Sequence, residues 1–311
     1  MKKIKIVTIF DKNYASLGFS MIESANRNIK ANVIFDVYPL SDFKLEIDSF
    51  AQENDLSINY SEDFFERADI LSRKVGRGYS EFIFSLTPSI LLNSLANQED
   101  IDLLIYLDAD TFFFHEVNLD IFLDNRSPIH LIPHQFNERN KHLNKYGRIN
   151  VGWLSINPAS NDSKLFLEWW EKLCIQSTSQ ASSMLEKGVF GDQLYLDNAY
   201  KTFDVDEIKF SRINVAPWNY DSYDGNHKKK IIMYHFHGLY KVGMRYFLPS
   251  IYFRRFTQKS EKILYRNYIK IIESIQLKYS LPQSLQNARR GKSNLLKLIL
   301  FIFGETMVNE K

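Results

Sequence analysis

The sequence predicts a mixed α/β domain with a mainly parallel sheet at residues 1–240, followed by a helical extension at residues 241–311. In the first 110 residues, apolar strand-length runs alternate with helix-length segments, the pattern of strand–helix–strand units. The 311 residues are 45% hydrophobic and 14% aromatic, enough for a full-sized core. Charge changes sign near residue 241: the extension holds 14 Lys and Arg and four Glu (+10), and the domain 25 basic and 33 acidic residues (−8).

Strands and helices are expected to alternate up to the first acidic cluster. In order they are a strand at Ile4–Phe10, a helix at Tyr14–Asn28, a strand at Asn32–Val37, a helix at Glu81–Ala96 and a strand at Leu103–Leu107. Ligands of such sheets bind beyond the carboxyl ends of the strands. The residues that follow Phe10 and Leu107 are therefore the first candidates for a functional site.

The rest of the domain continues the pattern. Further strands are expected at Ile129–Ile132, Val151–Ile156 and Ile231–Tyr234, further helices at Ser163–Gln176 and Asp192–Tyr200, and basic, aromatic helices from Lys241 onward. The single cysteine, Cys174, lies in a helical pattern and is expected to be a buried, unreactive thiol. One cysteine cannot form an internal disulfide, which fits a reducing compartment. The apolar run at the N-terminus is interrupted by Lys5 and lacks a small-residue cleavage site, so we expect a strand rather than a signal peptide, and a cytoplasmic protein.

Two carboxylates follow the strand at Leu103–Leu107. Asp108 and Asp110 can reach a common point where the backbone leaves the extended form. Oxygen ligands of this kind suit Mg²⁺ or Mn²⁺, which can bridge the two phosphates of a nucleotide diphosphate. The same residues can instead cap the end of the strand. The apolar strand distinguishes this D-x-D pattern from a second copy, Asp204–Asp206, which we expect to be a solvated surface pair.

A second polar cluster follows the strand expected at Ile231–Tyr234. His235 and His237 face the same way on an extended chain. A neutral imidazole can complete a metal shell, and the ammonium of Lys241 can neutralise phosphate charge. Gly238 allows the backbone to approach a ligand closely. A lone histidine at a strand end is more often structural, but this combination favours a diphosphate site.

These segments together resemble the retaining glycosyltransferases of family 8, which have the GT-A fold, and a bacterial group of nucleotide-diphospho-sugar transferases. The resemblance covers residues 1–240 and rests on five segments in the family's order. They are Phe10–Tyr14, Leu107–Asp110, Asn150–Gly152, Asp192–Gln193 and His235–Lys241. The chain departs from the family at Val242 and Gly243, where the family has Pro-Trp.

The resemblance implies a role for each segment. The residues that it places on the nucleotide-sugar donor are Asp11, Asn13, Asp108, Asn150, Gly238 and Lys241. Those that it places on Mn²⁺ or Mg²⁺ are Asp108, Asp110 and His235, with His235 preferred over His237. It places Asp192 and Gln193, the expected catalytic pair, beside the anomeric carbon. The implied reaction transfers a sugar from a nucleotide-diphosphate donor, a UDP-sugar by the first segment's likeness to uridine contacts, to a glycan or lipid-linked acceptor with retention.

Several of these residues also have a structural explanation. Asp11 and Asn13 can cap the first helix, where Asp and Asn are favoured. Asp192 can be the N-cap of the helix that follows it, which would leave Gln193 as the better candidate at the reacting centre. Asn150 can be a strand-edge amide.

Aromatic and imidazole side chains outside the five segments have two interpretations as well. Trp218 and Asn219 lie in an expected loop, where the indole can form an acceptor wall or pack in the core. His130 and His134 flank an Ile-Pro turn and are expected to be structural.

Spacing excludes a phosphatase of the haloacid dehalogenase type, which needs D-x-D-x-T or D-x-D-x-V. Here Thr111 follows Asp110 directly, and Phe112 occupies the required position. A sugar-1-phosphate nucleotidyltransferase would need a glycine-rich loop after the first strand, and Thr8–Asp11 contains no glycine. A non-catalytic nucleotide-sugar-binding or scaffold protein remains as a further alternative.

The extension at residues 241–311 mixes basic and apolar residues. A basic run at Ala288–Lys292 precedes an apolar stretch at Leu295–Phe303, which is about half the length of a membrane-spanning helix. This composition is typical of an anchor on an anionic membrane surface, here the inner face of the cell membrane, and equally of a helix packed on the domain. We expect no nucleic-acid partner, because no recognised binding motif accompanies the charge.

Overall fold

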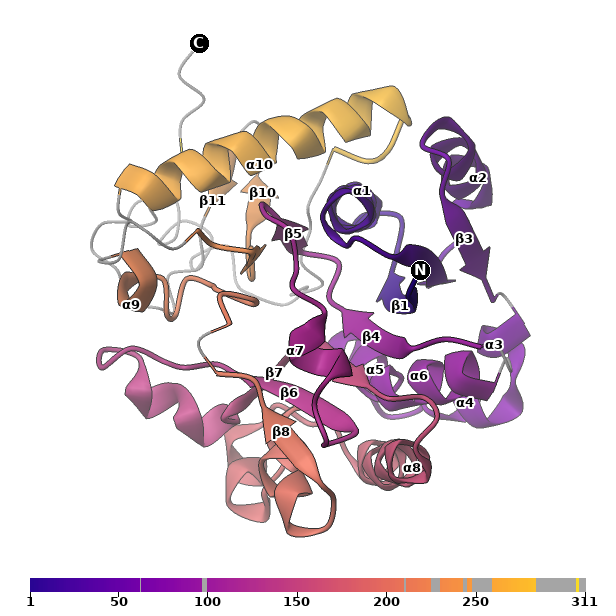
Figure 1. Cartoon of the computed structure of the whole chain (residues 1–311), viewed down its shortest axis with the longest axis vertical. Coiled ribbons are helices and arrows are strands. Elements are labelled where there is room, and N and C mark those ends of the chain that lie inside the picture. The colour runs from indigo at the N-terminus through magenta and orange to yellow at the C-terminus, as the bar shows by residue number, and fades with distance from the viewer. Residues whose placement is uncertain are drawn as a thin grey trace.

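The computed structural model describes residues 1–61, 63–96, 100–209, 211–224, 230–242, 245–247, 259–283 and 306–307. In these residues the chain forms three layers, a central sheet with helices on both faces (Figure 1). The predicted mixed α/β fold is confirmed.

The central sheet contains seven strands. They are β1 (Lys3–Phe10), β2 (Asn32–Pro39), β3 (Ser57–Tyr60), β4 (Leu103–Leu107), β6 (Ile129–Pro133), β7 (Ile149–Ile156) and β8 (Val205–Glu207), in the order β3-β2-β1-β4-β7-β6-β8. Strands β3, β2, β1 and β4 are parallel, whereas β7 runs antiparallel to both β4 and β6. Because β1 and β4 are parallel neighbours, the segments after Phe10 and Leu107 leave the same edge of the sheet.

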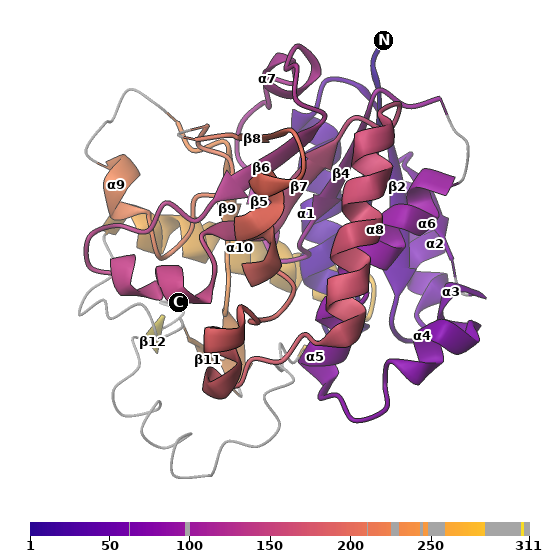
Figure 2. The ribbon, with the colours of Figure 1, turned by 90° about the horizontal axis from the view of Figure 1, so that it is seen from below.

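One face of the sheet is covered by α1 (Ala15–Asn28), α2 (Lys44–Glu53) and α10 (Lys259–Lys278). The other is covered by α6 (Thr87–Ala96) and α8 (Asn161–Gln176), which lie on the near side in Figure 2. Side chains of β1 alternate between the layers: Ile4 and Ile6 pack toward α1, and Val7 and Ile9 toward α6. The predicted buried thiol, Cys174, lies in α8, and burial raises its pKa well above the usual range.

Shorter elements connect and flank these layers. They are α3 (Asp63–Glu66), α4 (Ala68–Ser72), α5 (Tyr79–Phe84), β5 (Thr111–Phe113), α7 (Asp120–Leu123), the 3₁₀ helices Lys141–Tyr146, Ser182–Lys187 and Leu194–Lys201, α9 (Asp221–Asp224), β9 (Met233–His235), β10 (Tyr240–Val242), β11 (Arg245–Phe247) and β12 (Thr306–Met307). Strands β5 and β9 form an antiparallel pair, and β10, β11 and β12 form a small sheet.

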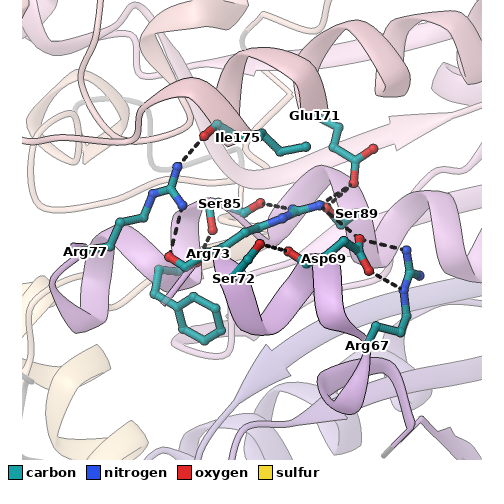
Figure 3. Close-up of polar contacts among 10 residues, drawn as sticks. Arg67, Asp69, Ser72, Arg73, Arg77, Ser85, Ser89, Glu171 and Ile175 are labelled. Carbon is teal, nitrogen blue, oxygen red and sulfur yellow. Dashed lines mark hydrogen bonds and ion pairs between the residues drawn. The ribbon is translucent and has the colours of Figure 1, made fainter. Parts of the chain in front are cut away.

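A buried arginine ties α4, α6 and α8 together (Figure 3). The Arg73 side chain is 4% exposed; its Nη1 donates to the Ser85 carbonyl at 2.9 Å and to Ser89 Oγ at 2.6 Å. Its Nη2 lies 3.0 Å from Glu171 Oε1 in α8. Arg77 donates to the carbonyl oxygens of Arg73 and Ile175. These contacts set where the start of α6 lies over the sheet.

Three predicted elements differ from the structure. The single helix expected at Glu81–Ala96 is two helices, α5 and α6, because Arg73 takes the Ser85 carbonyl and Pro88 starts a new first turn. The helix expected at Asp192–Tyr200 is the 3₁₀ helix Leu194–Lys201. The prediction of helices from Lys241 onward is wrong for β10 and β11, where β-forming Tyr, Val and Phe residues pair instead.

Helix α10, predicted within the basic extension, packs on α1. Gln276 Nε2 donates to Ser16 Oγ at 3.2 Å, and Ile275 and Tyr279 join the core beneath the sheet. This part of the extension follows the packed-helix alternative. The segments Ala288–Lys292 and Leu295–Phe303 lie outside the described residues. Among the helices that are described, none has both the length and the apolar run needed to cross a bilayer.

Candidate functional site

Strand pairing brings the D-x-D segment next to the histidine segment. Strands β5 and β9 pair with Thr111 opposite His235, which sets Asp110 beside the end of β9. Main-chain bonds continue the contact, because the Phe236 N–H donates to the Asp110 carbonyl at 2.8 Å. The His235 N–H donates to the Val215 carbonyl at 2.7 Å. Two segments distant in sequence are thus held together at the carboxyl end of β4.

The three residues expected to bind the metal lie together. His235 Nε2 is 3.0 Å from Asp110 Oδ1 and 3.7 Å from Asp108 Oδ2. One ligand atom each of Asp110, His235 and His237 lies within 4.8 Å of the other two. This group contains His237, which the family resemblance ranked below His235, and does not contain Asp108. Metal binding itself stays a prediction.

A chain of amide side chains orients His235. Its Nδ1 lies 3.1 Å from Asn214 Oδ1, and Asn214 Nδ2 donates to Asn150 Oδ1 at 2.5 Å. Because Nδ1 faces Asn214, Nε2 points toward the two carboxylates; burial lowers the pKa of His235, but the Asp110 and Asp108 carboxylates outweigh burial and raise it. His235 is 1% exposed, and its Nε2 has no hydrogen-bond partner of good geometry. A buried nitrogen that faces carboxylates fits a positive charge between them, which a proton or a bound cation can supply.

Glycine at position 152 is required for this arrangement. A Cβ atom there would lie 2.6 Å from Asn150 Oδ1 and 2.6 Å from His235 Nδ1. The Gly152 N–H also donates to Asn150 Oδ1 at 2.8 Å. The Asn-Val-Gly segment that the sequence analysis assigned to the donor sugar thus supports the imidazole from behind, and contact between Asn150 and donor stays a prediction.

The charges of the cluster favour a positive ion. Burial raises the pKa of Asp108, and the neighbouring Asp110 carboxylate raises it further, against the lowering effect of His235. Burial also opposes ionisation of Asp110, but the contact with His235 outweighs burial and lowers the Asp110 pKa. Adjacent ligands of an octahedral ion with bonds of about 2.1 Å lie roughly 3 Å apart. The Asp110–His235 separation of 3.0 Å fits such an ion.

Asp108 is oriented from its own strand. Tyr106 Oη donates to Asp108 Oδ1 at 2.9 Å, and Thr111 Oγ1 donates to the Asp108 carbonyl at 2.9 Å. Tyr106 precedes Asp108 by two residues and therefore lies on the same face of the extended chain. The second D-x-D copy has different surroundings: Asp204 accepts from Ser127 Oγ at 2.7 Å, and Asp206 from Asn125.

Asp192 is buried and has a polar partner. Thr87 Oγ1 donates to its Oδ2 at 2.8 Å, and Trp170 Nε1 donates to its carbonyl at 2.8 Å. Burial, with a smaller contribution from the Asp108 charge, raises the pKa of Asp192 to about 7. Its carboxylate makes no N-cap bond to the 3₁₀ helix Leu194–Lys201, so that alternative was wrong. Its catalytic role stays a prediction, as does that of Gln193.

Asp11 stabilises the turn before α1 and does not cap the helix, whose N-cap is Tyr14 without a side-chain cap bond, so the capping alternative was wrong. Its Oδ1 accepts from the N–H groups of Asn13 at 2.9 Å and Tyr14 at 3.1 Å. Tyr79 Oη donates to its Oδ2 at 2.6 Å, which links β1 to the helices of the opposite layer. Asn13 is exposed at the same edge of the sheet. Contacts of Asp11 and Asn13 with a nucleoside stay predictions.

Gly238 and Lys241, two further expected donor residues, follow β9, and Gln193 precedes the 3₁₀ helix Leu194–Lys201. Gly238 has φ +74°, the left-handed conformation that favours glycine. The Lys241 ammonium lies 3.6 Å from Glu273 Oε1 of α10 and 4.7 Å from the centre of the Tyr246 ring. Its predicted bond to a donor phosphate would require it to leave Glu273. Gln193 Nε2 donates to the Tyr146 carbonyl at 2.8 Å.

Trp218 is 1% exposed, so its core-packing alternative is confirmed. Its ring centre lies 5.0 Å from that of His134, 5.5 Å from His235 and 5.6 Å from His237. His134 has the expected structural role: its Nε2 lies 3.0 Å from Asn150 Nδ2, and burial lowers its pKa to about 3. Sequence reasoning missed Asn214, Tyr106 and Thr87 as supports of the site.

Sequence comparisons find two similar proteins. No family model matches the chain. Two uncharacterized proteins of Bacillus subtilis (strain 168) are similar in sequence: YfnD is 26% identical over 217 residues, covering 66% of this chain and 68% of YfnD, and YfnF is 28% identical over 190 residues, covering 54% and 60%.

Two solved structures are similar in fold. The galactosyltransferase LgtC, in complex with donor and acceptor sugar analogues, matches with a TM-score of 0.50 at 16% identity, covering 87% of this chain and 95% of LgtC. The bifunctional glycosyltransferase WbbM matches with a TM-score of 0.50 at 14% identity, covering 76% of this chain and 46% of WbbM. The chain therefore has the GT-A fold, and it spans less than half of WbbM.

Proposed function

We propose that this protein is a metal-dependent glycosyltransferase that moves a sugar from a nucleotide-diphosphate donor, preferably a UDP-sugar, to a glycan or lipid-linked acceptor with retention. The main support is the meeting of Asp108, Asp110 and His235 at the carboxyl end of β4 in a GT-A fold. The fold neighbours LgtC and WbbM are glycosyltransferases, which supports the same class of reaction.

In this proposal Asp108, Asp110 and His235 hold Mn²⁺ or Mg²⁺. The bound ion supplies positive charge where negative charge builds on the departing phosphate. The protein's own contribution is preorganisation: Asn214 fixes the imidazole and Tyr106 fixes the Asp108 carboxylate, so neither side chain must reorient on binding. Lys241 exchanges Glu273 for a donor phosphate.

Asp192 and Gln193 act on the sugar side of the donor. An Asp192 carboxyl with a pKa of about 7 is partly protonated near neutral pH, so it can donate or accept a hydrogen bond at a sugar hydroxyl. Thr87 keeps one of its oxygens in place. Asp11 and Asn13 lie at the adjacent strand exit and contact the nucleoside in this proposal.

Product analysis of the purified protein with Mn²⁺ and a panel of UDP-sugars tests the proposal. Release of UDP would support a transferase, pyrophosphate exchange would indicate a nucleotidyltransferase, and absence of both would indicate a scaffold. Asp110→Ala should lower UDP release by about 10³-fold, since a catalytic ion contributes several kcal/mol. Asp204→Ala, in the second D-x-D copy, is the matched control and should leave the rate unchanged. An unchanged rate in the Asp110 variant would refute the assignment.

A further inference from the structure

His237 follows the end of β9 and returns to the side of the chain that His235 occupies. Phe236, between them, points the opposite way and stacks on Tyr268 of α10, with ring centres 3.7 Å apart and planes at 10°. Phe236 is fully buried, so that stack fixes which side the two imidazoles take. Gly238 then turns the backbone away with a positive φ. The cluster therefore receives two imidazoles from three consecutive residues.

The two rings are held at an angle rather than stacked. Their centres lie 5.4 Å apart, with planes at 84°, and the Trp218 ring backs both at 5.5 and 5.6 Å. Two ligands on opposite sides of one ion with bonds of 2.0–2.6 Å lie about 4 to 5 Å apart. The ligand atoms of Asp110, His235 and His237 lie within 4.8 Å of one another, so one ion can contact all three.

We propose that His237 is a second imidazole ligand of the cation, and that it makes the site prefer later first-row ions such as Co²⁺ over Mg²⁺. This inference rests on the metal site of the proposed function. The buried Nε2 of His235, which lacks a hydrogen-bond partner of good geometry, marks the point on which the ligand atoms converge. Imidazole nitrogen suits later first-row ions, whereas Mg²⁺ prefers oxygen ligands and retained water. Two imidazoles beside the Asp110 carboxylate therefore select against Mg²⁺.

Metal titration with a spectroscopic reading tests this inference without any substrate. Calorimetry would give the dissociation constants of Co²⁺, Mn²⁺ and Mg²⁺, and the visible absorption of bound Co²⁺ would report a change in its ligands. His237→Gln should weaken Co²⁺ binding by at least about tenfold, the loss that removal of even an outer partner causes. Mg²⁺ affinity should change much less, and the Co²⁺ spectrum should shift. His115→Gln makes the same replacement at a histidine outside the cluster and should match the wild type.

A second variant keeps the test valid if the first fails to fold. His237→Glu replaces nitrogen by oxygen and should move the preference toward Mg²⁺, lowering the ratio of Co²⁺ to Mg²⁺ affinity. Wild-type Co²⁺ affinity and spectrum in both His237 variants would overturn the role of His237 alone, provided that Asp110→Ala loses all three ions. Unchanged binding in Asp110→Ala, or a wild-type protein that binds none of the ions, would overturn the metal site and with it the proposed function.

Discussion

Replacing Asp192 by asparagine should make the metal-free protein more stable than the wild type at pH 8. Asp192 is 6% exposed, and burial raises its pKa from an ordinary value of 3.8 to about 7. The folded state therefore binds a proton more tightly than the unfolded chain does. With respect to this group, stability is greatest below pH 4, falls between pH 4 and pH 7, and is lowest above pH 7, because the unfolded chain gives up the proton near pH 4 whereas the folded carboxyl keeps it until about pH 7.

The size of the effect follows from the shift. A difference of about three pKa units corresponds to about 4 kcal/mol at pH 8, which is an upper bound because relaxation and water entry reduce it. Asparagine keeps an oxygen that can accept from Thr87 Oγ1 and carries no charge. Asp192→Asn should thus gain roughly 2–4 kcal/mol at pH 8 and no more than about 1 kcal/mol at pH 4.5.

Urea unfolding in the presence of a chelator, at pH 4.5 and pH 8, measures both values. The chelator matters, because a cation beside Asp108 would offset the charge of Asp192. Asp204→Asn, an exposed carboxylate, is the control and should show no pH-dependent gain. Equal pH dependence in wild type and Asp192→Asn would refute the account of a strained, buried carboxyl. A gain in stability with loss of UDP release would show that function maintains this unfavourable charge.

Two further predictions concern the scaffold, and a third concerns the basic extension. Gly152→Ala should lower the free energy of unfolding by about 1–3 kcal/mol through overpacking, and it should abolish cation binding because the new Cβ displaces His235. The control is Gly78→Ala, whose Cβ would meet nothing closer than 3.9 Å and which should still bind the ion in the same calorimetric titration. Arg73→Met should lower the free energy of unfolding in urea by about 3–5 kcal/mol, because it leaves the partly buried Glu171 carboxylate without its cation. Arg67→Met breaks only the half-exposed pair with Asp69 and should cost under about 1 kcal/mol. Neutralising the basic residues of segment 288–292 should weaken the free energy of binding to phosphatidylserine vesicles by about 1 kcal/mol per charge, measured by sedimentation with the vesicles. Unchanged sedimentation would contradict a lipid-binding extension.

The sequence identified most of the central sheet because its strands are continuous apolar runs bounded by polar residues. Buried strands such as Leu103–Leu107 need that composition wherever they pair. The break between α5 and α6 was not predictable from periodicity, since it depends on Arg73 reaching the Ser85 carbonyl. The short strand β10 was missed for a similar reason: three residues carry too little pattern, and pairing with β11 decides their conformation.

For the site, the residues with distinctive chemistry were predicted and their supports were not. Asp108, Asp110 and His235 stand out because carboxylates and imidazoles follow apolar strands. Asn214 has no local pattern that marks it, and its role depends on a contact 21 residues away in sequence. The contact between Thr87 and Asp192 joins residues 105 apart and exists only once α6 lies over the sheet.

The pairing of β5 with β9 gives a bound cation a mechanical role. Asp110 and His235 are 125 residues apart in the chain, yet they are joined through two strands of three residues each. An ion between Asp110 and His235 would close a long loop in the chain and, like a cross-link, would lower the entropy of the unfolded chain. Chelation should then expose the segment from β9 to α10 to proteases sooner than the β1–β4 half, so that loss of the ion would be visible as limited cleavage before global unfolding.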